Sequence, residues 1–121
     1  MKKILLFAFL FLSNFIFGQT CGVPNVNLFG TTNITSTSAK PYWTAISGAA
    51  SYKVQYRIRN VGASYSSSFS TTTNSITLTN LLPSTKYEFI VQTICTNGGS
   101  SLFSSSGWFT TLAGTSTLLS I

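Results

Sequence analysis

The sequence is almost empty of the side chains that carry proton-transfer and metal chemistry. It contains no histidine and a single acidic residue, Glu88. Paired carboxylates, a serine–histidine–aspartate triad and a zinc site are therefore excluded within this chain. Serine is abundant, but neither a histidine nor a well-placed lysine is available to activate it as a nucleophile. The composition predicts a protein that is not an enzyme and that uses no cofactor and no metal.

Charge is equally sparse, since only 7% of the residues are charged. Lys2 and Lys3 belong to an N-terminal segment that is expected to be removed, as argued below. Five cations and one carboxylate then remain, so the net charge falls from +6 to +4 (five minus one). These cations are Lys40, Lys53, Arg57, Arg59 and Lys86. Such a balance is typical of simple solubility and only weakly indicates an acidic partner. Nucleic acid is not an expected partner, because the tyrosines near Arg57 and Arg59 alternate with the charges and so face the core.

The one long apolar run lies at the N-terminus. Lys2 and Lys3 precede apolar residues 4–17, and the small residue Gly18 precedes polar Gln19. This order is typical of a secretory signal peptide over residues 1–18, with cleavage near Gly18. It predicts a protein that is secreted or held in the cell envelope, in an extracellular or periplasmic location. We expect a domain over residues 19–111 and a tail or linker stub over residues 112–121.

Two other interpretations of the N-terminal run are weaker. A membrane anchor needs about 20 apolar residues, whereas Ser13 and Asn14 interrupt a shorter run. A lipoprotein signal would place a small residue such as Gly or Ala directly before Cys21, and Thr20 stands there instead. No stable membrane span is therefore expected once the signal peptide is removed.

Cysteine is limited to Cys21 and Cys95. An even count in an exported chain suggests one disulfide. In the chain-entropy treatment, a loop of that length stabilises the fold by about 4.5 kcal/mol. This contribution matters because a domain of this size buries only about 60–70% of its unfolded surface.

The remaining sequence shows the period of two that is typical of strands and no sustained helical period. Short runs rich in Val, Ile, Thr, Tyr and Phe alternate with Gly, Ser and Asn clusters, which predicts an all-β sandwich or barrel. A loop is expected at residues 30–32, and a break or bulge at Pro41, because proline removes a ladder hydrogen bond. The expected strands are residues 23–28, 38–45, 51–59, 65–70, 75–81, 86–95 and 104–111.

Alternation also assigns faces to the expected strands. Tyr65 and Phe69 are expected on one face of their strand, Phe109 inward and Trp108 outward. Glu88 is expected to face solvent beside Lys86. The expected structural core consists of Trp43, Tyr52, Val54, Tyr56, Leu81, Pro83, Tyr87, Phe89 and Val91.

Leu81, Pro83, Thr85 and Tyr87 spell L-x-P-x-T-x-Y before a run of alternating apolar residues. Together with Trp43 and the strand spacing, this pattern resembles the fibronectin type III family over about residues 21–111, in a secreted bacterial form. The resemblance implies a seven-stranded, immunoglobulin-like β-sandwich. It also implies that Tyr87 forms a tyrosine corner, its hydroxyl bonded to the backbone of the preceding turn.

The family topology places the start of the first strand and the end of the sixth at the same pole. The resemblance therefore implies a bridge between Cys21 and Cys95, as in similar domains of secreted bacterial proteins. Pro41 departs from the family pattern, which usually has an aliphatic core residue there. The loop at residues 96–102 lacks the Arg-Gly-Asp ligand signal.

The resemblance implies a spacer or protein-interaction module, with a protein or a surface glycan as partner. The alternatives are a carbohydrate-binding module and an accessory domain of a larger secreted enzyme or adhesin. The loops at residues 47–50, 71–74 and 96–102 are expected to cluster at one pole, either as a recognition site or as plain connectors. Outward Ile90 and Ile94 suit either a partner surface or strand propensity alone. The candidate ligand contacts are Asn97, Gly98, Gly99, Ser100, Trp108, Ile90 and Ile94, with Tyr42 and Trp108 as exposed rings for sugar stacking.

Overall fold

The computed structural model describes residues 21–25 and 30–114. The expected signal peptide, residues 26–28 of the first expected strand and residues 115–121 of the tail lie outside the described residues. Within these ranges the regular structure is β-strand, and no helix there has the length and apolar character that a membrane crossing requires. The strands are β1 (Gly30–Thr32), β2 (Lys40–Tyr42), β3 (Ala49–Ile58), β4 (Phe69–Thr71), β5 (Lys86–Cys95) and β6 (Gly107–Thr110).

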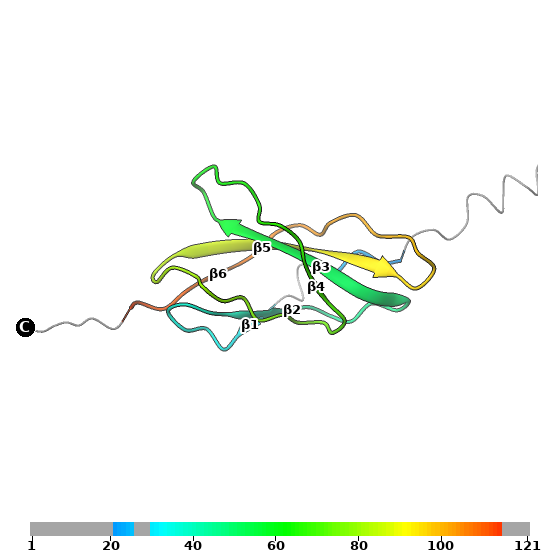
Figure 1. Cartoon of the computed structure of the whole chain (residues 1–121), viewed down its shortest axis with the longest axis horizontal. Coiled ribbons are helices and arrows are strands. Elements are labelled where there is room, and N and C mark those ends of the chain that lie inside the picture. The colour runs from blue at the N-terminus through cyan, green and yellow to red at the C-terminus, as the bar shows by residue number, and fades with distance from the viewer. Residues whose placement is uncertain (1–20, 26–29, 115–121) are drawn as a thin grey trace, which may run out of the picture.

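The strands form two layers, with β1 and β2 in one and β3 and β5 in the other (Figure 1). The larger sheet has the order β4-β3-β5-β6, and all its pairs are antiparallel. Residues 75–78 extend the smaller sheet, because Ala39 bridges Leu78 and Tyr42 bridges Ser75. This segment occupies the place of the fifth expected strand. The prediction of an all-β sandwich is confirmed.

The centre of the larger sheet is the pairing of β3 with β5, each ten residues long. Both strands alternate apolar and polar residues with β-branched or aromatic side chains on the inner face, a pattern that suits a half-buried strand. The observed bounds of β5 are those expected from the sequence. At the start of β3 the expected turn is narrower, since Ala49 and Ala50 belong to the strand and the register shifts between Ala49 and Ser51.

Pro41 lies within β2 and is fully buried. The Ile76 N–H donates to the Pro41 carbonyl at 3.2 Å, and Pro41 has no N–H to return. The register is the same on both sides, at Ala39↔Leu78 and Tyr42↔Ser75. The expected break at Pro41 is therefore one missing hydrogen bond, without a bulge.

The expectation of a loop at residues 30–32 is wrong, because these residues form β1 and pair with β2. A Cβ added at Gly30 would lie 2.3 Å from the hydroxyl oxygen of Tyr42, so the Tyr42 ring packs directly over the strand backbone. Glycine in a strand commonly marks such a close approach. No strand is seen in residues 21–25, the described part near the first expected strand.

Tyr65 and Phe69 do not share a face of one strand, contrary to expectation. Only residues 69–71 of this region form a strand, β4. The Phe69 ring stacks on Tyr56 of the inner face at 5.8 Å between centroids. Tyr65 instead approaches Glu88 on the outer face, with its hydroxyl 3.3 Å from the carboxylate. The serine-rich stretch between them has no strand geometry, which lets the chain pass from one face to the other.

The last expected strand is regular only over β6, because serines interrupt its first half. Gly107 lies seven positions after Ser100, whereas their partners Phe89 and Ile94 are five positions apart, so the edge segment contains two extra residues. The extra residues are accommodated at two serines whose hydroxyls replace backbone carbonyls as acceptors. Thr93 N–H donates to Ser101 Oγ, and Val91 N–H donates to Ser104 Oγ, both at 3.0 Å.

The core lies between the two layers and includes Trp43, Tyr52, Val54, Leu81, Tyr87, Phe89, Val91 and Phe109. Tyr56 is half-buried at its margin. Pro83 is exposed, so its assignment to the core is wrong. It lies at the surface in the turn that Ser84 completes with a φ of 51°. Tyr87 is 4% exposed, and its hydroxyl accepts a hydrogen bond from Leu82 N–H at 2.9 Å, which is the corner implied by the resemblance.

Candidate functional site

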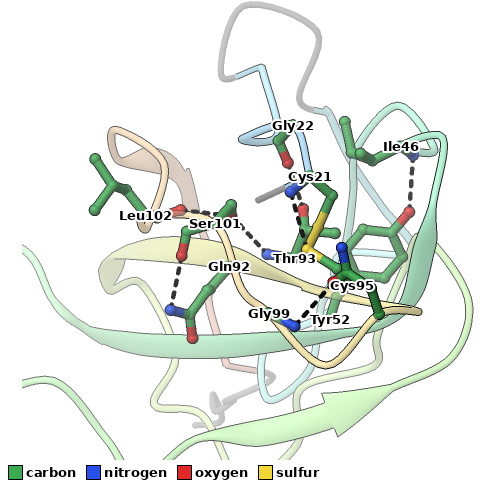
Figure 2. Close-up of a disulfide and its surroundings, with 11 residues drawn as sticks. Cys21, Gly22, Ile46, Tyr52, Gln92, Thr93, Cys95, Gly99, Ser101 and Leu102 are labelled. Atoms are coloured by element: carbon green, nitrogen blue, oxygen red, sulfur yellow. Dashed lines mark hydrogen bonds between the residues drawn. A yellow bond between two sulfur atoms is a disulfide. The ribbon is translucent and has the colours of Figure 1, made fainter. Parts of the chain in front are cut away.

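One pole of the sandwich is fixed by the disulfide between Cys21 and Cys95, whose Cα atoms are 5.6 Å apart (Figure 2). Beside the disulfide, the Thr93 hydroxyl donates to the Gly22 carbonyl at 2.8 Å. The Tyr52 hydroxyl accepts a hydrogen bond from Ile46 N–H at 2.9 Å. The disulfide and the Thr93 bond attach the N-terminal segment to the end of β5, and the Tyr52 bond holds the loop before β3 against β3.

Residue contacts bring the expected loops together at this pole. Thr96 N–H donates to the Gly48 carbonyl at 2.9 Å, which joins the loops at residues 47–48 and 96–99. Asn74 Nδ2 donates to the Trp43 carbonyl at 2.6 Å, which places the loop at residues 71–74 beside them.

The glycine-rich loop after β5 is closed by its own hydrogen bonds. Gly98 N–H donates to the Cys95 carbonyl at 3.1 Å, and Cys95 N–H donates to the Gly99 carbonyl at 2.8 Å. Gly99 N–H donates to Asn97 Oδ1 at 3.0 Å. Gly98 has a φ of 94°, which glycine adopts without strain. Ser100 bridges Ile94 of β5. These bonds account for the residue types of the loop as a tight connector.

The second candidate region is the outer face of the larger sheet, where Glu88 has been misjudged from the sequence. Its residue is only 8% exposed, although alternation predicted a solvent-facing carboxylate. Arg57 Nε donates to Glu88 Oε2 at 2.5 Å, and Arg59 Nε lies 3.6 Å from Oε1. Arg57 of β3, Arg59 just after β3 and Tyr65 therefore surround the carboxylate.

The hydrogen bond to Glu88 raises the pKa of Arg57 above its ordinary value, so the guanidinium stays charged. The Arg57 guanidinium also lies 4.1 Å from the centroid of the Tyr65 ring. The Tyr65 hydroxyl lies 3.3 Å from both Glu88 Oε2 and Ser106 Oγ. Arg57, Glu88 and Tyr65 therefore form a mutually supported cluster on the sheet.

Trp108 lies next to this cluster, opposite Glu88 in the pairing of β5 with β6. Its side chain faces outward as expected, and the residue is 54% exposed. The Arg59 guanidinium lies 5.0 Å from the indole ring centroid and the Lys86 ammonium 4.8 Å from it. Both distances are within the range of cation–π attraction. We refer to Arg59, Lys86 and Trp108 as the indole–cation platform.

The other candidate contacts do not join the indole–cation platform. Ile90 and Ile94 lie outward on β5 opposite Gln55 and Ser51, and both are half-buried. The glycine-rich loop follows the far end of β5, seven residues beyond Glu88. That separation is about 23 Å at about 3.3 Å per residue. The sequence-predicted contacts thus do not form one site, because Trp108 lies on β6 beside the start of β5 whereas the glycine-rich loop follows the end of β5.

A small pocket opens elsewhere, beside β4. Its volume is about 160 Å³, and no charged residue lines it. Binding sites for small molecules usually enclose about 300–1,000 Å³. The pocket is therefore no better than the outer face as a candidate site. It is lined by Tyr56, Phe69, Thr77, Leu78, Thr79 and Asn80.

Tyr42 is a weaker candidate for ring stacking than the sequence suggested. It is 40% exposed, but its ring packs against the backbone at Gly30. The residues that sequence reasoning did not assign to the site are Arg57, Arg59, Tyr65, Lys86 and Glu88. Alternation placed Arg57, Arg59, Lys86 and Glu88 on outer faces, but only the strand register shows that they meet.

Comparisons with known proteins agree with this architecture. A sequence profile of the fibronectin type III domain matches residues 24–106. A comparison with curated proteins gives no significant match. The chain is similar to a solved myokine structure, with 24% identity, a TM-score of 0.64 and coverage of 75% of this chain and 97% of that one.

Two further solved structures show the same fold. The fibronectin type III domain of human fibronectin type III domain containing protein 3 is 22% identical, with a TM-score of 0.64 and coverage of 81% of this chain and 92% of that one. A fibronectin type III-like protein from Clostridium thermocellum is 25% identical, with a TM-score of 0.57 and coverage of 73% and 90%. Domains of this kind typically act as spacers or interaction modules. By its sequence profile and its two-layer fold, the chain belongs to the fibronectin type III family.

Proposed function

We propose that this chain is an exported, non-enzymatic module that acts as a spacer or a protein-interaction domain at or outside the cell envelope. The observation that carries the proposal is that Glu88 is engaged in ion pairs. It is the one side-chain carboxylate in a sequence without histidine, and it lies in ion pairs with Arg57 and Arg59. This leaves neither a second carboxylate nor a histidine in the sequence for general acid–base catalysis, which favours a role in binding or spacing.

Export is supported by two independent features. Lys2, Lys3 and the apolar residues 4–17 have the order of a signal peptide, with cleavage near Gly18. A disulfide across 74 positions suits an oxidising compartment. The same bridge argues against a lipoprotein, because a lipid-modified Cys21 would have no thiol left for Cys95.

Intact-mass measurement on the chain produced by its own host tests export. The expected product begins at Gln19, is found outside the cytoplasm, and has the mass of the oxidised form. A cytoplasmic product that retains Lys2 and Lys3 would contradict export, and a lipid-modified Cys21 would contradict the proposed maturation. Retrieval of partners from surface and secreted fractions then distinguishes an interaction module from a spacer.

A carbohydrate-binding module is the second candidate, favoured by the 54% exposure of Trp108. Exposed indole rings stack on sugars. A glycan array with the wild-type protein and with Trp108→Ala tests it. Reproducible binding that the substitution abolishes would support this alternative over a protein partner.

A further inference from the structure

The indole–cation platform places two cationic groups over one exposed ring. The backbone N–H of Arg59, the residue directly after β3, donates to the carbonyl of Lys86 at the start of β5 at 2.9 Å, so the two residues lie side by side. Both cationic heads then lie over the Trp108 ring. Contact with the ring limits the motion of these long side chains, so less conformational entropy is lost when they bind a ligand.

The charges of the platform are not balanced within the described part of the chain. Arg57 takes the closest position on Glu88, at 2.5 Å, while Arg59 lies 3.6 Å away through Nε alone. Neither described ion pair includes Lys86. The platform therefore presents the outer part of one guanidinium and one ammonium beside an exposed apolar ring.

A carboxylate partner for Arg59 and Lys86 would have to come from another kind of molecule. Glu88 is the one side-chain carboxylate in the sequence, and it is 8% exposed beneath the arginines. A second copy of this chain consequently has no acidic side chain to place against Arg59 and Lys86. Self-association through this face would instead bring like charges together.

We propose that the indole–cation platform binds an acidic segment of a different protein, in which carboxylates alternate with apolar side chains. The inference rests on the proposed function as an interaction module. The carboxylates pair with Arg59 and Lys86, and an apolar side chain packs on the exposed indole edge.

The same geometry disfavours a neutral sugar. A sugar that stacks on this ring competes with the charged heads of Arg59 and Lys86, which already lie within cation–π distance of it. It would also offer no charge in exchange. An acidic peptide keeps both cation–ring contacts and adds ion pairs, so the contacts cooperate rather than compete.

The test uses the full chain as its host produces it, with the disulfide intact. The probe is a fluorescein-labelled peptide of about 12 residues that alternates Glu with Leu, Gly and Ser. Its charge density is high enough for the salt dependence of its Kd to be measured. The matched peptide replaces every Glu with Gln, and heparin serves as a sulfated polysaccharide. Anisotropy gives the Kd, and the emission of exposed Trp108 reports contact, because Trp43 is buried.

The acidic peptide is expected to bind and the Gln peptide is not. Lys86→Gln and Arg59→Gln should each weaken binding by about three- to tenfold, and Trp108→Ala by about tenfold. The matched control is Lys40→Gln, which removes the same charge from β2 in the other sheet and should change Kd by about twofold at most. Glu88→Gln should tighten binding, since it releases both arginines.

Several results would overturn the proposal. Equal weakening by Lys86→Gln and Lys40→Gln would show that net charge alone drives the binding. Binding of heparin with no binding of the acidic peptide would assign the platform to anionic polysaccharide. If the wild-type chain binds no acidic peptide but is exported and retrieves partners, the platform assignment fails while the proposed function stands.

Discussion

Replacing Tyr87 with Phe isolates one hydrogen bond at the tyrosine corner. The hydroxyl accepts from Leu82 N–H at 2.9 Å, and the ring packs against Tyr56 and Phe109 with centroids 6.0 and 5.7 Å away. Phenylalanine retains the ring contacts and removes only the acceptor. A backbone donor left without a partner costs about 1–3 kcal/mol. We therefore expect the free energy of unfolding to fall by about that amount, with the fold unchanged.

Urea denaturation of the oxidised protein measures this loss. The midpoint should fall while the slope of free energy against urea stays constant, because the substitution changes no buried apolar surface. The Tm should fall by about 4–8 °C for each kcal/mol in a domain of this size. Tyr42→Phe is the matched control, since Tyr42 is 40% exposed, and its expected change is within about 0.5 kcal/mol. Equal midpoints for the two variants would refute the role assigned to the corner.

Three other substitutions test separate parts of the structure. Cys95→Ser opens the disulfide loop and should lower the free energy of unfolding by about 4.5 kcal/mol, measured by urea denaturation against the oxidised wild type; reduction of the wild type without a similar loss would contradict this. Ser104→Ala removes the acceptor for buried Val91 N–H and should cost about 1–3 kcal/mol, whereas Ser105→Ala at an exposed site should cost less. Glu88→Gln leaves Arg57 and Arg59 without a carboxylate, so the Tm should fall. High salt should reduce the difference in Tm between the variant and the wild type by screening the two cations. An unchanged Tm would show that the ion pairs add no stability.

The central strands could be predicted from the sequence because a single rule governs them. In β3 and β5, one face meets the core and the other does not, so side chains alternate along the whole strand. The corner at Tyr87 was implied by its motif, and in the structure the Tyr87 hydroxyl accepts a hydrogen bond from the turn backbone, as the motif requires. Pro83 was also predicted to lie in the core because it belongs to this motif, but it is a turn residue and lies at the surface.

The smaller sheet and the sheet edges were harder to predict because individual tertiary contacts, not a repeating pattern, determine their residue types. Gly30 fits in a strand because the Tyr42 ring packs over it. The alternation of nearby residues cannot reveal this contact, because the two residues are far apart in the sequence. Ser101 and Ser104 resemble the other serines of the chain. Their role depends on donating amides of β5, and only the strand pairing reveals those donors.

The outer-face cluster shows the limit of alternation as a guide to exposure. Period two correctly placed Glu88 opposite the core, but the face of a sheet is not always open to solvent. Arg57 reaches it from β3, and Tyr65 reaches it from a segment without strand geometry. The charge count is a signal that the alternation argument did not use, since one carboxylate faces five cations in the sequence without Lys2 and Lys3.

The edges of the larger sheet also bear on how a partner binds. Strand addition requires a regular row of free backbone groups, and β4 offers only three residues. The opposite edge contains two extra residues between Ser101 and Gly107, and Leu102 in this segment protrudes with 79% exposure. Bulges of this kind protect an edge against pairing with another chain. Strand addition is therefore disfavoured at both edges of the larger sheet, so the partner proposed for this sheet would bind through side chains such as the exposed ring and cations of the indole–cation platform.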